Sequence, residues 1–166
     1  MSGIIGAAGS KSGVIGETEL DYEEGTWTPQ WKSEGGSGEC TYSDSGNSVN
    51  GVYTKVGRMV VANLMTGIAG TSGVAAGNVI IEGLPYPPDN VLDDTSYEAS
   101  GSCSYWTGYG SSVSCLIPLV AQQGHIKLNE IPGGGSANNS FALISDLTSN
   151  SVFRITVTYF IGGGGS

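Results

Sequence analysis

Three aromatic residues and two glycines lie close together in the second half of the chain. Tyr105, Trp106 and Tyr109 belong to the hexapeptide Tyr-Trp-Thr-Gly-Tyr-Gly at 105–110. Aromatic side chains with a polar end bury a large area at low entropic cost, and sugar rings stack on their faces. At a hairpin tip they would form a shallow platform, so these three residues are the predicted ligand-binding site, with a glycan as ligand. The alternative that Tyr105 and Trp106 close one end of the core stays open, because large rings are seldom wholly buried.

Residue types that perform catalysis are present, but without the partners that catalysis needs. His125 is the only histidine, and neither Cys115 nor any serine lies in a G-x-S-x-G motif. His125 alternates with Lys127 on a predicted strand, which favours an exposed or rim position. The sequential pairs Glu23–Glu24 and Asp93–Asp94 would point apart on a strand, so neither predicts a two-carboxylate site. We therefore predict a protein without enzymatic activity and without catalytic residues.

A cluster of oxygen-bearing side chains follows a proline-rich segment. Asp89, Asn90, Asp93 and Asp94 supply the hard ligands that calcium prefers. Their spacing matches no EF-hand loop, and clustered aspartate and asparagine are also typical of turns. We interpret them as a solvated acidic turn and expect neither a metal ion nor a cofactor.

The composition favours a single all-β domain. Glycine supplies 28 of the 166 residues, and 15 acidic against 6 basic residues give a net charge of −9. The glycines disfavour helix, and the acidic balance leaves no basic stripe for nucleic acid or for anionic lipids. No apolar run approaches the ~20 residues of a membrane helix, and the chain lacks the basic n-region of a signal peptide. We expect synthesis in a cytoplasm, no nucleic-acid partner and no membrane insertion.

Three cysteines are scattered along the chain at Cys40, Cys103 and Cys115. They form no Cys-x-x-Cys motif, and an odd number cannot be fully paired within one chain. We interpret them as small core hydrophobes, with a disulfide between Cys103 and Cys115 as the less favoured alternative in a reducing compartment.

Alternating apolar and polar residues predict about eight strands. The clearest is the last, over 153–161, whose length indicates a central strand and which a strand at 141–144 would join in a terminal hairpin. Gly57 is predicted to form a bulge or tight turn, and Leu84–Pro88 an extended connection between sheets. Turns at this spacing are typical of a sandwich or barrel. The other predicted strands span 51–56, 59–65, 78–82, 98–106, 112–120 and 125–128.

The start of the chain combines a short repeat with two tryptophans. Ser-Gly-Ile-Ile-Gly at 2–6 recurs as Ser-Gly-Val-Ile-Gly at 12–16, and its apolar residues are too few for a core of their own. Trp27 and Trp31 occupy odd positions that would share one face of a strand, so we assign them to packing at the join with the repeat rather than to a ligand. The predicted assembly residues are Ile4, Ile5, Val14 and Ile15.

Four blocks of sequence together resemble a known family. In order they resemble the C-terminal head modules of bacteriophage tail fibres and related virion appendages, of the marine, cyanophage-like kind. The nine residues Asp21–Pro29 are the most specific part, and the strands after Pro88 match in character only. The blocks are Ser-Gly-Val-Ile-Gly at 12–16, Glu-Leu-Asp-Tyr-Glu-Glu-Gly-Thr-Trp-Thr-Pro at 19–29, Gly-Val-Tyr-Thr-Lys-Val-Gly-Arg at 51–58 and Ile-Glu-Gly-Leu-Pro-Tyr at 81–86.

The resemblance implies a virion protein with an antiparallel, jelly-roll-like β-sandwich as its head domain over 21–161. Residues 1–20 would form an attachment or assembly segment, and residues 1–24 would dock on other virion proteins. Residues 162–166 are predicted to be a flexible Gly/Ser tail, of the kind also used as a cloning linker. Members of the family are commonly trimers, so we expect a homotrimer.

Two functions follow from this resemblance. The first is attachment to a host-surface glycan, in which several weak sites on one particle reinforce one another by avidity. The alternative is a purely structural virion component, such as a capsid decoration or a self-assembling fibre subunit. In that case the N-terminal segment would add a strand to a neighbouring subunit.

Overall fold

Strands make up most of the computed structural model, which describes residues 21–43, 49–89, 97–110, 112–121, 123–133 and 140–162. The described residues contain no α-helix, only the 3₁₀ turn η1 (Ile144–Asp146), and so no helix among them is long and apolar enough to cross a membrane. The all-β class predicted from the sequence is confirmed. In chain order the strands are β1 (Tyr22–Trp27), β2 (Gln30–Ser33), β3 (Thr41–Tyr42), β4 (Asn50–Val56), β5 (Met59–Gly70), β6 (Val79–Glu82), β7 (Tyr97–Tyr109), β8 (Val113–Ala121), β9 (His125–Pro132), β10 (Ser140–Phe141) and β11 (Leu147–Phe160).

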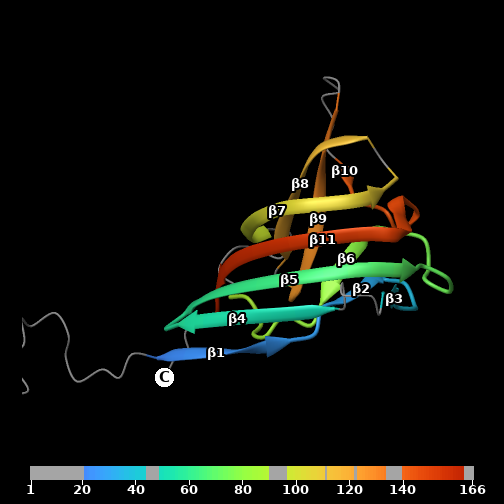
Figure 1. Ribbon diagram of the computed structural model, residues 1–166. Helices are drawn as coiled ribbons and strands as arrows, with labels where there is room; N and C mark the ends of the chain where they lie inside the picture. Colours follow the sequence, from blue (N-terminus) through green and yellow to red (C-terminus); the bar gives the residue numbers. More distant parts are fainter. Residues whose placement is uncertain are drawn as a thin grey trace, which may run out of the picture.

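The strands form two layers that share one long strand. Hydrogen-bonded neighbours follow the order β1-β4-β5-β11-β7-β8-β9-β6-β2, with β3 and β10 attached to β5 and β9. Strand β7 pairs with β8 near its start and with β11 over 101–109, so the sheet turns from one layer into the other within β7. We call β1-β4-β5-β11-β7 the first sheet and β7-β8-β9-β6-β2 the second sheet; Figure 1 shows the second behind the first. The predicted antiparallel, jelly-roll-like sandwich is confirmed.

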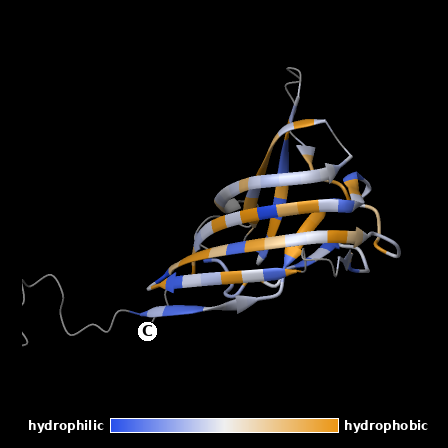
Figure 2. Ribbon diagram, viewed as in Figure 1, coloured by the Kyte–Doolittle hydropathy of each residue, from blue (hydrophilic) through white to orange (hydrophobic). Residues whose placement is uncertain are grey.

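Strand β11 shows the pattern that builds both layers. Phe153, Ile155 and Val157 are buried, while Arg154 and Thr158 between and beyond them are exposed. Successive side chains of a strand point to opposite faces, so this alternation places one set in the core and the other in solvent. Bands of apolar and polar colour along β5 and β11 show it in Figure 2. The strand lies between β5 and β7, which confirms its predicted central position.

Aromatic rings from both sheets meet in the core. Trp31 on β2 lies against Phe153 on β11, with ring centroids 4.7 Å apart, and Tyr109 on β7 contacts Phe153 edge-on at 6.1 Å. Trp31 and Phe153 are both fully buried. Such contacts stabilise beyond the area that the rings bury, so this cluster holds the two layers together.

Trp27 and Trp31 belong to different sheets, so the prediction that they share one strand is wrong. Strand β1 ends at Trp27, and after Thr28 and Pro29 the chain enters the second sheet at β2. Proline has no N–H to donate to a ladder, which explains the break. Both tryptophans are buried in the core. Their contact with the N-terminal repeat stays a prediction, because residues 1–20 lie outside the described ranges.

Local turns match the sequence predictions better than long-range pairings do. Gly57 has a φ of +57° and forms the predicted tight turn between β4 and β5. Leu84–Pro88 connects β6 to β7 as predicted. The predicted terminal hairpin is wrong: Phe141 on β10 pairs with Asn129 on β9, and β11 pairs instead with β5 and β7. The two long strands offer β11 many more ladder hydrogen bonds than the two-residue β10 could.

Candidate ligand-binding face

The three aromatic residues predicted as one platform do not share a face of β7. Trp106 pairs with the buried Phe153 and packs against the core. Tyr105 pairs with Arg154 on the outer, solvent-facing side of the first sheet, and both are exposed. Of the three predicted residues, only Tyr105 therefore presents its ring on that surface, and binding of a ligand by Tyr105 stays a prediction.

Tyr109 is directed inward and is held by polar contacts. Its hydroxyl donates a hydrogen bond to the buried carboxylate of Glu130, which also accepts one from Ser140 Oγ at 2.8 Å. Burial, and then the contact with Glu130, raise the pKa of Tyr109. The hydroxyl therefore stays protonated and acts as a structural donor near one end of the core.

A β-bulge in β7 decides which residues reach the outer face. Tyr105 pairs with Arg154 while Cys103 pairs with Ile155, so Ser104 is an extra residue with no register partner of its own on β11. The bulge lets Cys103 face the core and leaves Ser104 and Tyr105, two successive residues, both exposed. Bulges often re-aim side chains next to functional sites, so this irregularity draws attention to the surface beside it.

A shallow cavity of about 370 Å³ opens beside the bulge, on the outer face of the first sheet. It extends over β4, β5, β11 and β7, and its lining mixes two amides, two hydroxyls and one guanidinium with aliphatic side chains. A few convergent polar groups on an apolar floor are the usual composition of a small-molecule site. The lining residues are Asn50, Val52, Asn63, Leu64, Met65, Ser104, Arg154, Ile155 and Thr156.

Strand pairing positions two of the polar residues that line the cavity. Asn63 on β5 lies directly opposite Thr156 on β11, and Thr156 Oγ1 donates a hydrogen bond to Asn63 Oδ1 at 2.6 Å. The backbone carbonyl of Asn63 accepts a further hydrogen bond from Trp27 Nε1 at 3.2 Å. The first contact fixes the Asn63 side-chain oxygen against β11, and the second fixes the Asn63 backbone.

Arg154 supplies the positive charge of the cavity. Its guanidinium carbon lies 5.4 Å from the centroid of the Tyr105 ring, a cation–π contact. Within the described ranges, Arg154 is the one cation that has no carboxylate at ion-pair distance. The others form the pairs Lys32–Glu82, Lys55–Asp21, Arg58–Asp89 and Lys127–Glu34.

A second hollow continues the cavity toward the edge of the sheet. It measures about 400 Å³, extends over β1 and β4, and shares Val52 and Asn63 with the first. The two together form a groove across the first sheet, which we call the outer-face groove, with Arg154 at one end and Glu24 at the other. Because its lining extends from β1 to β7, over five neighbouring strands, the groove suits a chain-like ligand better than a single small molecule.

Exposed apolar side chains also gather on this face. By strand alternation and register, five of the six large apolar residues that are exposed in the described chain lie on the outer side of the first sheet. Apolar side chains concentrated on one face indicate an interaction surface. They are Tyr22, Val52, Met59, Tyr105 and Phe160; the sixth is Leu143.

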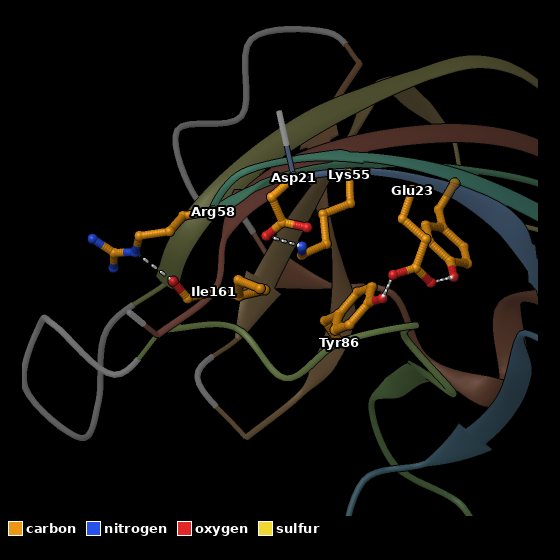
Figure 3. Close-up of polar contacts among 7 residues, drawn as sticks. Asp21, Glu23, Lys55, Arg58, Tyr86 and Ile161 are labelled. Carbon is orange, nitrogen blue, oxygen red and sulfur yellow. Dashed lines mark hydrogen bonds and ion pairs between the residues drawn. The ribbon is translucent and has the colours of Figure 1, made fainter. Parts of the chain in front are cut away.

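Two carboxylates at the start of β1 bind side chains of the same domain. Glu23 accepts hydrogen bonds at 2.5 Å from the hydroxyls of both Tyr53 and Tyr86, and Asp21 accepts one from Lys55 Nζ at 2.5 Å. Figure 3 shows Tyr86 directed at Glu23, and Lys55 at Asp21. The hydrogen bonds from Tyr53 and Tyr86 lower the pKa of the Glu23 carboxyl. The cluster fastens the connection after β6 to the first sheet, and docking of residues 1–24 on another virion protein stays a prediction.

His125 is buried, so its predicted exposed or rim position is wrong. Only 8% of it is accessible, and burial, followed by the charge of Lys127, lowers its pKa. The segment after β2 explains the burial, because Glu34 in that segment binds Lys127 at 2.5 Å and so crosses this face of β9. His125 Nε2 has no hydrogen-bond partner among the described residues.

The three cysteines form no disulfide in the structure. Cys40 and Cys103 are buried as predicted, whereas Cys115 is exposed. Burial raises the pKa of both Cys40 and Cys103 to about 11, which keeps them as unreactive thiols.

The described residues contain no cluster of three potential metal ligands. Of the four residues in the predicted acidic turn, Asp89 binds Arg58, and Asn90, Asp93 and Asp94 lie outside the described ranges.

The fold has a counterpart among solved structures. The crystal structure of the Dettilon tailspike protein (gp208) matches with a TM-score of 0.61 and 21% sequence identity, over 84% of this chain and 24% of that one. The chain resembles a tailspike domain in fold. It spans about a quarter of the tailspike chain, and at this identity the likeness concerns the fold alone. No protein-family model and no curated protein matches the sequence.

Sequence reasoning missed most of the groove. Asn63, Ser104 and Thr156 are ordinary polar residues of strands, and their meeting depends on pairing between distant segments. The one available signal was Arg154, a cation at an outward position of a strand whose next two outward residues are threonines.

Proposed function

We propose that this chain is a host-attachment domain of a bacteriophage tail appendage and that it binds a host-surface glycan in the outer-face groove. The composition of the groove carries the proposal. Amides and hydroxyls from Asn50, Asn63, Ser104 and Thr156 line it over an apolar floor, and the Tyr105 ring stands at its rim. Sugars present hydroxyl groups on a partly apolar ring, and this lining matches both features. The tailspike-like fold and the sequence resemblance support the placement in a virion.

Affinity at one such groove would be low. The groove is shallow and open, so it buries a ligand only partly, and a weak single site is the expected result. Several copies on one particle would raise the overall binding by ~10²–10⁴ through effective concentration. A homotrimer, as the sequence resemblance implies, would supply this multiplicity. Light scattering of the full chain tests it, with a discrete trimer as the expected mass.

Glycan binding is tested with two threonine variants of the same strand. Thr156→Val removes a hydroxyl inside the groove, whereas Thr158→Val makes the same change at an exposed position of β11 outside its lining. On arrays of bacterial surface polysaccharides, the first variant is expected to bind about two- to tenfold more weakly, the effect of one neutral hydrogen bond, and the second to bind as the wild type. Equal loss in both variants, or no binding by the wild type, would contradict the proposal.

The structural alternative is supported by the position of β1. This strand ends the first sheet and pairs with β4 alone among the described strands, and residues 1–20 lead directly into it. An unpaired edge is a template for strand addition. A chain that starts at Asp21 should then lose the ability to assemble while the full chain forms polymers. A receptor head would remain a discrete oligomer in both forms.

A further inference from the structure

We propose that the glycan bound in the outer-face groove carries a carboxylate and that Arg154 binds this group. The ligand class is therefore an acidic polysaccharide that contains uronate or a related sugar acid. The inference rests on the proposed function, because it names the ligand chemistry of the same groove.

The charge pattern of the described chain carries the first step. The protein is acidic, and its other described cations, Lys32, Lys55, Arg58 and Lys127, each bind a carboxylate of the domain. Arg154 lines a cavity and has no such partner there. A guanidinium presents five N–H donors in a rigid fork that matches a carboxylate, so a partner from outside the domain is expected.

The surroundings of Arg154 hold its guanidinium ready for such a partner. The Tyr105 ring lies over one face, with 5.4 Å between the guanidinium carbon and the ring centroid, and Ser104 contacts the Arg154 backbone carbonyl from the bulge. This cation–π contact uses no N–H donor in a hydrogen bond, so the donors of the fork can still bind an anion. Restriction of the long side chain also lowers the entropic cost of binding.

The two ends of the groove have opposite charge, which sets the direction of the ligand. Glu24 lines the far hollow, and Arg154 lines the near one. An anionic substituent is repelled at the first and attracted at the second, so the sugar acid is placed over β11 and β7. One guanidinium balances one unit of charge. A carboxylate carries one negative charge, whereas a phosphate monoester carries ~−1.5 to −2. Because the protein has a net charge of −9 and would repel the excess, the single charge of Arg154 suits a carboxylate better.

The experiment uses the full chain on immobilised bacterial surface polysaccharides, neutral and uronate-bearing. Each acidic polysaccharide is also presented after chemical reduction of its carboxylates and, separately, after removal of phosphate. We expect binding to uronate-bearing samples that is lost on carboxyl reduction, survives phosphate removal and weakens with salt. Arg154→Gln should weaken it about tenfold or more, the usual worth of hydrogen bonds to a charged group. Arg58→Gln removes the same charge outside the groove and should leave the affinity unchanged.

Three results would overturn the inference, and they can be told apart. Equal binding to carboxyl-reduced samples, or an unaffected Arg154→Gln variant, would leave glycan binding in place and refute the carboxylate. Loss on phosphate removal would assign the anion to phosphate. No binding to any polysaccharide would refute the proposed function as well. Should Arg154→Gln fold poorly by circular dichroism, Arg154→Lys tests the same point, because it keeps the charge and loses the fork, and an intermediate affinity is expected.

Discussion

Replacement of Phe153 by alanine is the sharpest test of how the two sheets are held together. The ring is fully buried on the central strand and contacts Trp31 from the second sheet and Tyr109 from the edge of the first. Removal of a buried phenylalanine costs about 3–5 kcal/mol, from lost transfer energy and the cavity that remains. The two aromatic contacts place the expected loss in the upper half of that range. Against a total stability of about 5–15 kcal/mol, this change removes a large part of the folding free energy.

Urea unfolding followed by tryptophan fluorescence measures the effect, since Trp31 reports directly on the cluster. Phe160→Ala is the matched control, because Phe160 lies on the same strand and is 58% exposed on the outer face. It should change the free energy of unfolding by less than about 0.5 kcal/mol. Equal losses in the two variants, or a loss below about 1 kcal/mol for Phe153→Ala, would refute the assignment of inner and outer faces on β11.

Two further predictions concern the edge and the corner of the first sheet. Tyr53 and Tyr86 hold the folded-state pKa of Glu23 below 4.5, its ordinary value, so its contribution to stability is complete above that pH and is lost as the pH falls below it. Glu23→Gln should therefore flatten the fall of the urea midpoint between about pH 6 and about pH 3, and parallel curves would show that the cluster does not stabilise the fold. Gly101→Ala would bring a Cβ within 2.0 Å of the Thr156 carbonyl, so the pairing of β7 with β11 must shift. A loss of about 1–3 kcal/mol is expected in the same assay, with Gly133→Ala, whose Cβ would meet nothing closer than 3.5 Å, as the neutral control.

Local features could be predicted from the sequence because each carries its own signal. The alternation around Arg154 identifies β11 without knowledge of its neighbours, and Gly57 supplies the left-handed turn that joins β4 to β5. Pairing has no such local signal. Thr156 and Asn63 are 93 residues apart and meet only because β11 lies beside β5. The groove could not be predicted for the same reason, since its lining comes from five strands.

Burial depends on what covers a strand as well as on the period of the strand. His125 alternates with Lys127, which alone would place both on an open face. The segment after β2 crosses that face through the Glu34–Lys127 ion pair, and His125 becomes buried. Pro29 has a comparable effect earlier in the chain, because the break that it causes sends Trp27 and Trp31 to different sheets.

The bulge at Ser104 links the core to the proposed site. Strict alternation could not place both Cys103 and Trp106 in the core, because residues three apart on a regular strand face opposite sides. The extra residue resolves the conflict and leaves Ser104 and Tyr105 together on the outer face, where Ser104 lines the groove and Tyr105 makes the cation–π contact with Arg154. Deletion of Ser104 would make the register continuous, with Cys103, Tyr105 and Trp106 still opposite Ile155, Arg154 and Phe153, and would remove one hydroxyl from the groove. The extra residue of the bulge therefore adds a hydroxyl to the end of the groove at which an anionic sugar is expected to bind.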